Sequence, residues 1–194
     1  MPCVIRFLAA CVVVATALVP SAAPGAGSVV SARDPHGDVA ATDSAADVDP
    51  AVVASVDLQH VTVTRQAHGL RVVVRLKEVL PSRGRFVQQI GIAAMAPGWA
   101  GASWVFFVSV TPQHLGGALA FFVEVEDDGE PEPCHVDAAK GSQVVRLTIP
   151  DRCLPEDRGH LSVSSILLDK RSSDPLLAED DLEIRGNLDL TPRG

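Results

Sequence analysis

The sequence predicts an all-β protein, an antiparallel β-sandwich of about seven to nine strands, with a closed barrel as the alternative. Short runs of β-branched and other apolar residues recur about every ten residues, and Gly, Pro or Asp bounds each run. In the clearest run, over 70–76, large apolar residues alternate with Arg71, Val73 and Arg75. Regular short strands with almost no predicted helix are typical of sandwiches.

The predicted strands follow one another from residue 56 to residue 190. They cover 56–64, 70–76, 86–94, 104–110, 118–126, 143–149, 161–168 and 184–190. The alternation of the first strand breaks near His60, which predicts a β-bulge there. Pro175 suits the first turn of a helix, so we predict a short helix over 176–183. On that helix Glu179, Asp180 and Asp181 are interpreted as a solvent-exposed surface.

Residues 1–32 are interpreted as a secretory signal peptide with a small-residue exit segment. Arg6 is their only charged residue, and the apolar run over 7–19 is too short to span a bilayer. We expect cleavage between about residues 23 and 32, and no stable membrane span afterwards. The stretch ending at Cys11 resembles a lipoprotein acylation motif, but the apolar run continues beyond it, so lipidation is only the alternative.

Two further segments follow the leader. Residues 33–54 are rich in Ala, Gly, Pro, Ser and Asp and predict a flexible acidic N-terminal segment, whereas 55–194 carries the sandwich. The formal net charge of −8 disfavours binding to nucleic acid, which is itself a polyanion.

The four cysteines divide into two pairs. Cys3 and Cys11 lie in the leader, which leaves Cys134 and Cys153 in the mature protein. In an oxidising compartment this pair predicts a disulfide, which closes a loop of about 20 residues and contributes roughly 3 kcal/mol. The alternative, a pair of metal-binding thiolates beside His135, lacks the usual ligand spacing.

An oxygen-rich cluster near the N-terminus is the clearest candidate for chemistry. Asp34 and Asp38 lie on one Gly-containing turn, and Asp57 lies at the start of the first predicted strand of the sandwich. Because calcium takes six to eight oxygen ligands, these carboxylates predict a calcium site that would hold the N-terminal segment on the sandwich. The alternative is a solvated acidic linker. We expect no other cofactor.

Trp99 is the candidate ligand-binding residue. It lies in the Gly-rich loop Pro97-Gly98-Trp99-Ala100-Gly101, where an exposed indole stacks on a sugar ring or anchors a protein partner. The alternative is that Trp99 packs onto the sandwich.

Four short motifs resemble those of a group of uncharacterised secreted actinobacterial β-sandwich proteins. They are Asp34-Pro35-His36-Gly37-Asp38, Ser55-Val56-Asp57-Leu58 entering a strand, Gly69-Leu70-Arg71-Val72-Val73-Val74, and Pro150-Asp151-Arg152-Cys153-Leu154 after a strand, accompanied by Cys134. The start of the chain is similar to DOMON domains and to family-9 carbohydrate-binding domains. The resemblance implies a sandwich fold and assigns no ligand residues to this chain.

No catalytic motif is present, and the six His are dispersed. We therefore expect a secreted, non-enzymatic binding or accessory module of the cell envelope or extracellular space, whose ligand is a glycan or a protein. The alternative is a structural extracellular domain stabilised by calcium and a disulfide. A hydrolase whose triad is assembled only by folding is the third hypothesis.

Overall fold

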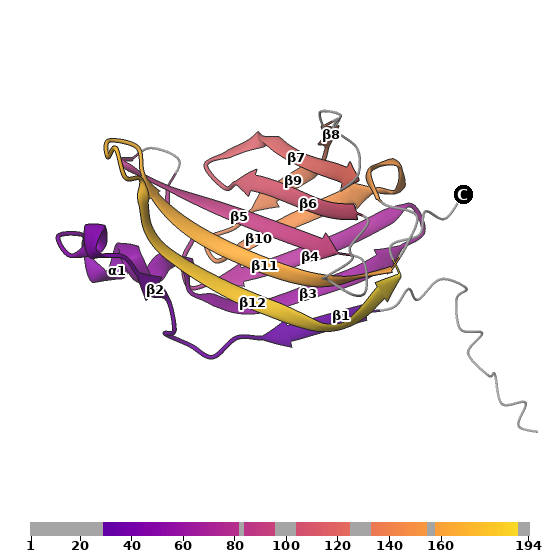
Figure 1. Cartoon of the computed structure of the whole chain (residues 1–194), viewed down its shortest axis with the longest axis horizontal. Coiled ribbons are helices and arrows are strands. Elements are labelled where there is room, and N and C mark those ends of the chain that lie inside the picture. Colours follow the sequence, from indigo (N-terminus) through magenta and orange to yellow (C-terminus); the bar gives the residue numbers. More distant parts are fainter. Residues whose placement is uncertain (1–28, 82–83, 96–103, 125–132, 155–157, 190–194) are drawn as a thin grey trace, which may run out of the picture.

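A computed structural model describes residues 29–81, 84–95, 104–124, 133–154 and 158–189. In this part of the chain two antiparallel sheets pack face to face, which confirms the predicted β-sandwich (Figure 1). No helix among the described residues is long and apolar enough to cross a membrane. The predicted signal peptide lies almost wholly outside the described residues.

The first sheet has five strands in the order β1-β3-β4-β10-β9. These are β1 (Val29–Arg33), β3 (Leu58–Gln66), β4 (Gly69–Leu76), β10 (Val144–Pro150) and β9 (Asp137–Lys140). The register between β3 and β4 shifts between Leu58 and His60, where the broken alternation predicts a bulge. β4 begins at Gly69, whose φ of +150° and close approach to the Ile149 carbonyl leave no room for a side chain.

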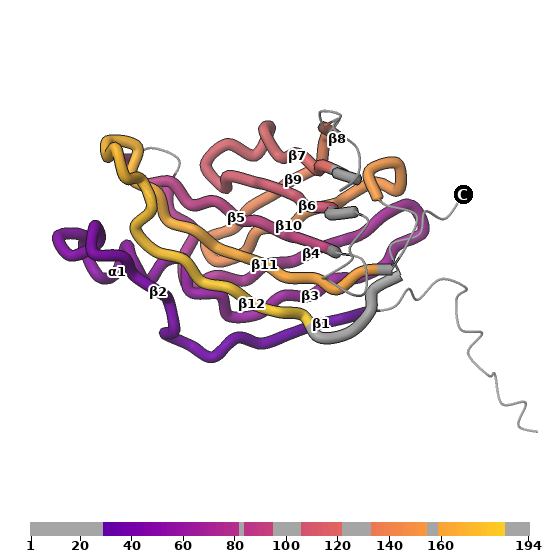
Figure 2. Tube along the Cα trace, viewed as in Figure 1, coloured from indigo at the N-terminus to yellow at the C-terminus, as the bar shows by residue number. Residues whose placement is uncertain are grey.

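The second sheet has seven strands in the order β2-β12-β11-β5-β6-β7-β8. These are β2 (Ala40–Ala41), β12 (Leu176–Asp189), β11 (Arg158–Asp169), β5 (Phe86–Met95), β6 (Trp104–Thr111), β7 (His114–Glu124) and β8 (Cys134–His135). β1 of the first sheet lies beside β12 of the second, so the two sheets meet along this side of the sandwich (Figure 2).

The main core fills the space between the sheets. Along β4, for example, Leu70, Val72, Val74 and Leu76 are buried, while Arg71 and Arg75 are exposed. This period-two pattern is the one expected of a strand with one buried face. β5, β6, β10 and β11 contribute inward-facing residues of the same kind, and together they form a single apolar cluster.

The segment over residues 39–56, here called the strap, differs from the prediction. The sequence predicts a flexible segment, whereas the structure forms β2, a 3₁₀ turn (Asp43–Ala45), α1 (Pro50–Val53) and a second 3₁₀ turn (Ala54–Val56). Ala45, Val48 and Val56 pack with Leu167, Leu177 and Ala178 in a second apolar cluster. The Thr42 amide and hydroxyl also donate hydrogen bonds to carbonyls of β12. Burial and these bonds attach the strap to the sandwich.

The helix predicted over 176–183 is wrong, because these residues belong to the long strand β12. Leu182 and Ile184 are buried, while Asp181 and Glu183, which alternate with them, are exposed. β12 pairs with β11 over most of its length, and this pairing outweighs the local preference of Pro175 for a helix start. Residues 184–189 therefore continue β12 and do not form a separate edge strand, while the last residue of the predicted strand, Leu190, lies outside the described residues.

Cys134 and Cys153 form the predicted disulfide. It joins β8 to the 3₁₀ turn η4 (Asp151–Cys153). In the same turn Asp151 forms an ion pair with Arg65 of β3, whose side chain is fully buried, at 2.7 Å. The disulfide and the ion pair thus hold one end of the sandwich together.

Candidate metal centre

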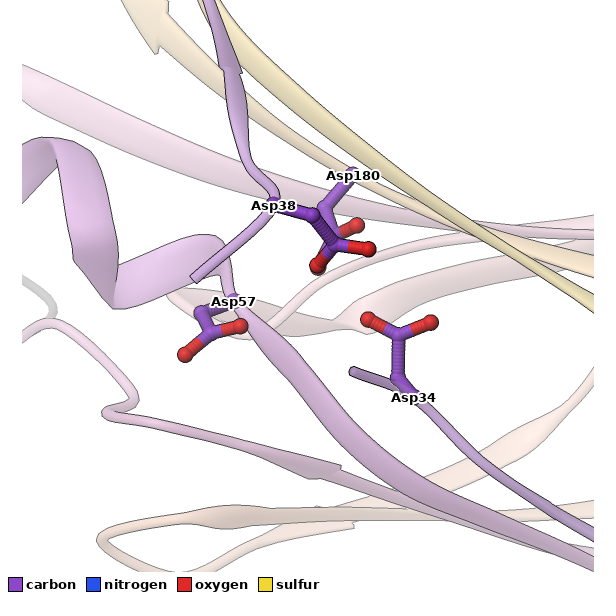
Figure 3. A group of neighbouring side chains, drawn as sticks. All are labelled: Asp34, Asp38, Asp57 and Asp180. Atoms are coloured by element: carbon purple, nitrogen blue, oxygen red, sulfur yellow. The ribbon is translucent and has the colours of Figure 1, made fainter. Parts of the chain in front are cut away.

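Four aspartates meet where the strap begins and ends. Carboxylate oxygens of Asp34, Asp38, Asp57 and Asp180 all lie within 4.8 Å of one another, and Figure 3 shows the four groups facing one shared space. The structure thus brings together all three aspartates that the sequence predicts, and it adds Asp180. Among the described residues this is the one group of three or more His, Cys, Asp or Glu side chains that could hold a metal ion.

A tight turn after β1 positions Asp34 and Asp38. The Asp34 amide donates to the Gln59 carbonyl and so continues the pairing of β1 with β3. Gly37 then adopts a φ of +84°, a left-handed conformation that glycine accepts without strain. Its amide donates to Asp57 Oδ1 at 3.1 Å. This bond links the turn before the strap to the residue that follows it.

Asp180 reaches the cluster from the opposite sheet. It lies on β12 with its side chain toward the interior, and only 5% of the residue is exposed. Its Oδ2 accepts a hydrogen bond of 2.6 Å from the amide of Leu58 on β3. A backbone amide is a good partner for a buried carboxylate, so this bond fixes the group between the sheets.

The cluster is mostly buried. Asp34 and Asp57 are 8% and 3% exposed, and Asp38 is the one member that faces solvent. Asp34 Oδ2 is a buried oxygen with no hydrogen-bond partner in the described part of the chain. Buried carboxylate oxygens are normally hydrogen-bonded or bound to a cation, because an unpaired one loses its hydration without compensation.

Electrostatics penalise the ionised cluster. Burial raises the pKa of Asp34 to about 7, and the charges of Asp180, Asp38 and Asp57 add to the increase. Burial also raises the pKa of Asp180, against the lowering effect of its bond from Leu58, and Asp38 and Asp57 raise it further. The neighbouring charges that act on Asp34 are all negative. A bound cation would supply the missing positive charge.

The donor set indicates the kind of cation that fits. All four donors are carboxylates, with no His or Cys among them, which suits a hard cation and not zinc or copper. Mg²⁺ usually binds one or two carboxylates and keeps several waters, whereas Ca²⁺ accepts many oxygens in flexible geometry. Four convergent carboxylates therefore fit Ca²⁺ best.

A pocket of about 390 Å³ adjoins the cluster. Its walls come from the strap and from Gly37 and Asp57, which lie just outside it, and they are mostly small apolar side chains such as Ala41, Ala45 and Val53. Asp57 therefore belongs both to the cluster and to the wall of the pocket.

Asp180 is the member that sequence reasoning missed. In a predicted helix it belonged to an acidic surface, but on a strand it alternates with the exposed Asp181 and points inward. The signal was present in the sequence, because Asp180, Leu182 and Ile184 follow the period of two that marks a buried strand face.

Trp99 lies outside the described residues, so its binding role stays a prediction.

Comparison of the chain with protein-family models, with curated protein sequences and with solved structures finds no match.

Proposed function

We propose that this protein is an exported structural β-sandwich domain that binds one calcium ion through Asp34, Asp38, Asp57 and Asp180. The observation that carries the proposal is the convergence of four carboxylates, three of them buried, one of which, Asp34, has a buried oxygen, Oδ2, with no hydrogen-bond partner among the described residues. Without a cation this arrangement is costly. With Ca²⁺, both the charge and the unpaired oxygen are compensated.

The ion would act by holding the two ends of the strap together. Asp34 and Asp38 precede the strap, Asp57 follows it, and Asp180 belongs to the sheet beneath it. One cation bound to all four would tie both ends of the strap to β12. Outside the cell, calcium is available for this role, and a leader of the kind in residues 1–32 would direct the protein there.

Calcium titration of the mature protein tests the proposal. We expect saturable binding of one Ca²⁺, detected by calorimetry after removal of metal. At free calcium 100-fold above Kd, ligand linkage stabilises the fold by about 2.7 kcal/mol. For a chain of this size that corresponds to roughly 5–10 °C in Tm. If millimolar calcium produces no binding heat and no shift in Tm, the proposal is refuted.

A matched pair of variants assigns the binding to this cluster. Asp180→Asn keeps an oxygen that accepts the bond from Leu58 but removes one charge, so we expect calcium affinity to fall by roughly tenfold or more. The metal-free variant should be at least as stable as the wild type, since one repulsive charge is gone. Asp181→Asn is the control, because Asp181 is the next residue and is exposed. If the two variants bind calcium with equal affinity, the ion binds at another site.

A further inference from the structure

Ser165 is the one polar residue among the four buried positions within 161–167 of β11; Asp169, farther along the same strand, is also buried but accepts a hydrogen bond from Arg85. Leu161, Val163 and Leu167 share its face and are buried apolar side chains. Ser165 is 0% exposed, and its hydroxyl has no hydrogen-bond partner among the described residues. A buried hydroxyl without a partner carries an energetic penalty, and alanine would avoid it at this position. The described part of the chain thus leaves this hydroxyl without a hydrogen-bond partner.

The strand register places Ser165 beside the candidate metal centre. Its partner on β12 is Asp180, and its partner on β5 is Ile90. Paired residues of antiparallel strands point to the same face, with their Cβ atoms about 4.5–5.5 Å apart. Since Ile90 is apolar, the polar neighbour of Ser165 in this interior row is Asp180. The Asp180 carboxylate is turned toward Leu58 of the other sheet and makes no hydrogen bond with the serine.

The coordination needs of calcium supply a partner for this hydroxyl. Calcium takes six to eight oxygens, and four carboxylates that each give one oxygen leave places for water or carbonyls. A water bound to the cation is polarised and needs a hydrogen-bond acceptor. Groups that hold the ligands of a metal by hydrogen bonds commonly change metal affinity by about 10–100-fold when they are removed.

We propose that Ser165 is a positioning residue of the calcium site: its hydroxyl hydrogen-bonds a cation-bound water on the interior side, next to Asp180. The inference rests on the proposed function, because it requires the ion. It also gives a reason why this core position carries serine. The penalty of the hydroxyl in the metal-free protein is relieved when the ion and its water are bound.

The test compares calcium affinity with the stability of the metal-free protein. In Ser165→Ala we expect calcium affinity to fall by about tenfold, while the metal-free Tm is unchanged or higher. If the serine had a purely structural role, Ser165→Ala would lower the metal-free Tm and leave the calcium affinity as it is. Ser164→Ala is the matched control, since Ser164 is the next residue, on the opposite face of β11, and should bind calcium like the wild type.

A second variant guards against packing effects. Ser165→Cys keeps the shape of the side chain but hydrogen-bonds weakly, so it should lose affinity as Ser165→Ala does. Wild-type affinity in either variant overturns the role of Ser165 and leaves the calcium site intact. If the wild-type protein binds no calcium, both proposals fall. The two failures are therefore distinguishable.

Discussion

At the scale of single residues, Asp34 is the residue through which the cluster should respond to pH and to calcium. Its carboxyl is buried next to three other carboxylates, and one of its oxygens has no hydrogen-bond partner in the described part of the chain. Such a group has two ways to lower its free energy: it takes up a proton, or it binds a cation. Protons and calcium therefore compete for the same carboxylate, and the stability of the metal-free protein should depend on pH more strongly than that of the calcium-bound protein.

We predict that the metal-free protein becomes more stable as pH falls from about 8 to about 5. The pKa of Asp34 is about 7 in the folded state, against an ordinary value of 3.8, so the folded state binds more protons between these values. Stability is then lowest above pH 7 and rises as pH falls through 7 toward 4. The full shift corresponds to about 4 kcal/mol at most. In saturating calcium the gain should disappear, because the bound ion keeps the Asp34 carboxyl ionised over this pH range.

Thermal melts across this pH range, with and without calcium, measure both effects. Asp34→Asn is the informative variant, because it removes the group whose pKa is raised and should flatten the pH dependence of the metal-free protein. If the slope is the same in Asp34→Asn and in the wild type, other groups control the pH response.

At the scale of elements, the sequence allowed the sandwich and part of the site to be predicted. Alternation along 70–76 defines β4 because one face of that strand is buried and the other is solvated. Asp34, Asp38 and Asp57 could be grouped because they lie within one short stretch of sequence. Asp180 could not, since it is 122 residues from its partner Leu58 and in a segment predicted as helix. A single wrong element therefore concealed one of the four carboxylates.

The strap was missed for a different reason. Its residues are small and its elements are only two to four residues long, so they produce no clear periodicity. What fixes the strap is long-range: pairing of β2 with β12, the bonds of Thr42, and burial of Val48 and Val56. A single sequence does not reveal such contacts, because they depend on where β12 lies.

We predict that calcium slows backbone amide exchange in the strap by at least about tenfold. The reason is its attachment: the carboxylates at both ends repel one another without the ion and are tied to β12 with it. Hydrogen exchange with mass spectrometry, in calcium and in chelator, measures the effect. Amides of β4 and β10 serve as the internal control, because they pair with each other in the five-stranded sheet and should change little. If calcium slows amide exchange uniformly over the whole chain, it stabilises the fold as a whole and does not act on the strap in particular.

At the scale of the whole molecule, two stabilising devices act on different ends of the sandwich. β8, which carries Cys134 of the disulfide, lies at the end away from α1 and β2, which belong to the strap (Figure 1). The disulfide end also holds the buried Arg65–Asp151 ion pair. The carboxylate cluster holds the other end, where the strap begins and ends. Sites that share no contacts usually contribute independently to stability.

We therefore predict that removal of the disulfide and removal of calcium have additive effects. The double variant Cys134→Ser/Cys153→Ser should lose about 3 kcal/mol by the loop-entropy model, which corresponds to roughly 6–12 °C in Tm. Its stabilisation by calcium should equal that of the wild type within about 0.5 kcal/mol, because the bond and the ion hold separate parts of the chain. Denaturant unfolding of both proteins, each with calcium and with chelator, measures the four free energies of unfolding that this comparison needs. A markedly smaller calcium effect in the double variant would contradict independence and would mean that strain at the disulfide end reaches the cluster through the long strands β11 and β12, which run between the two ends.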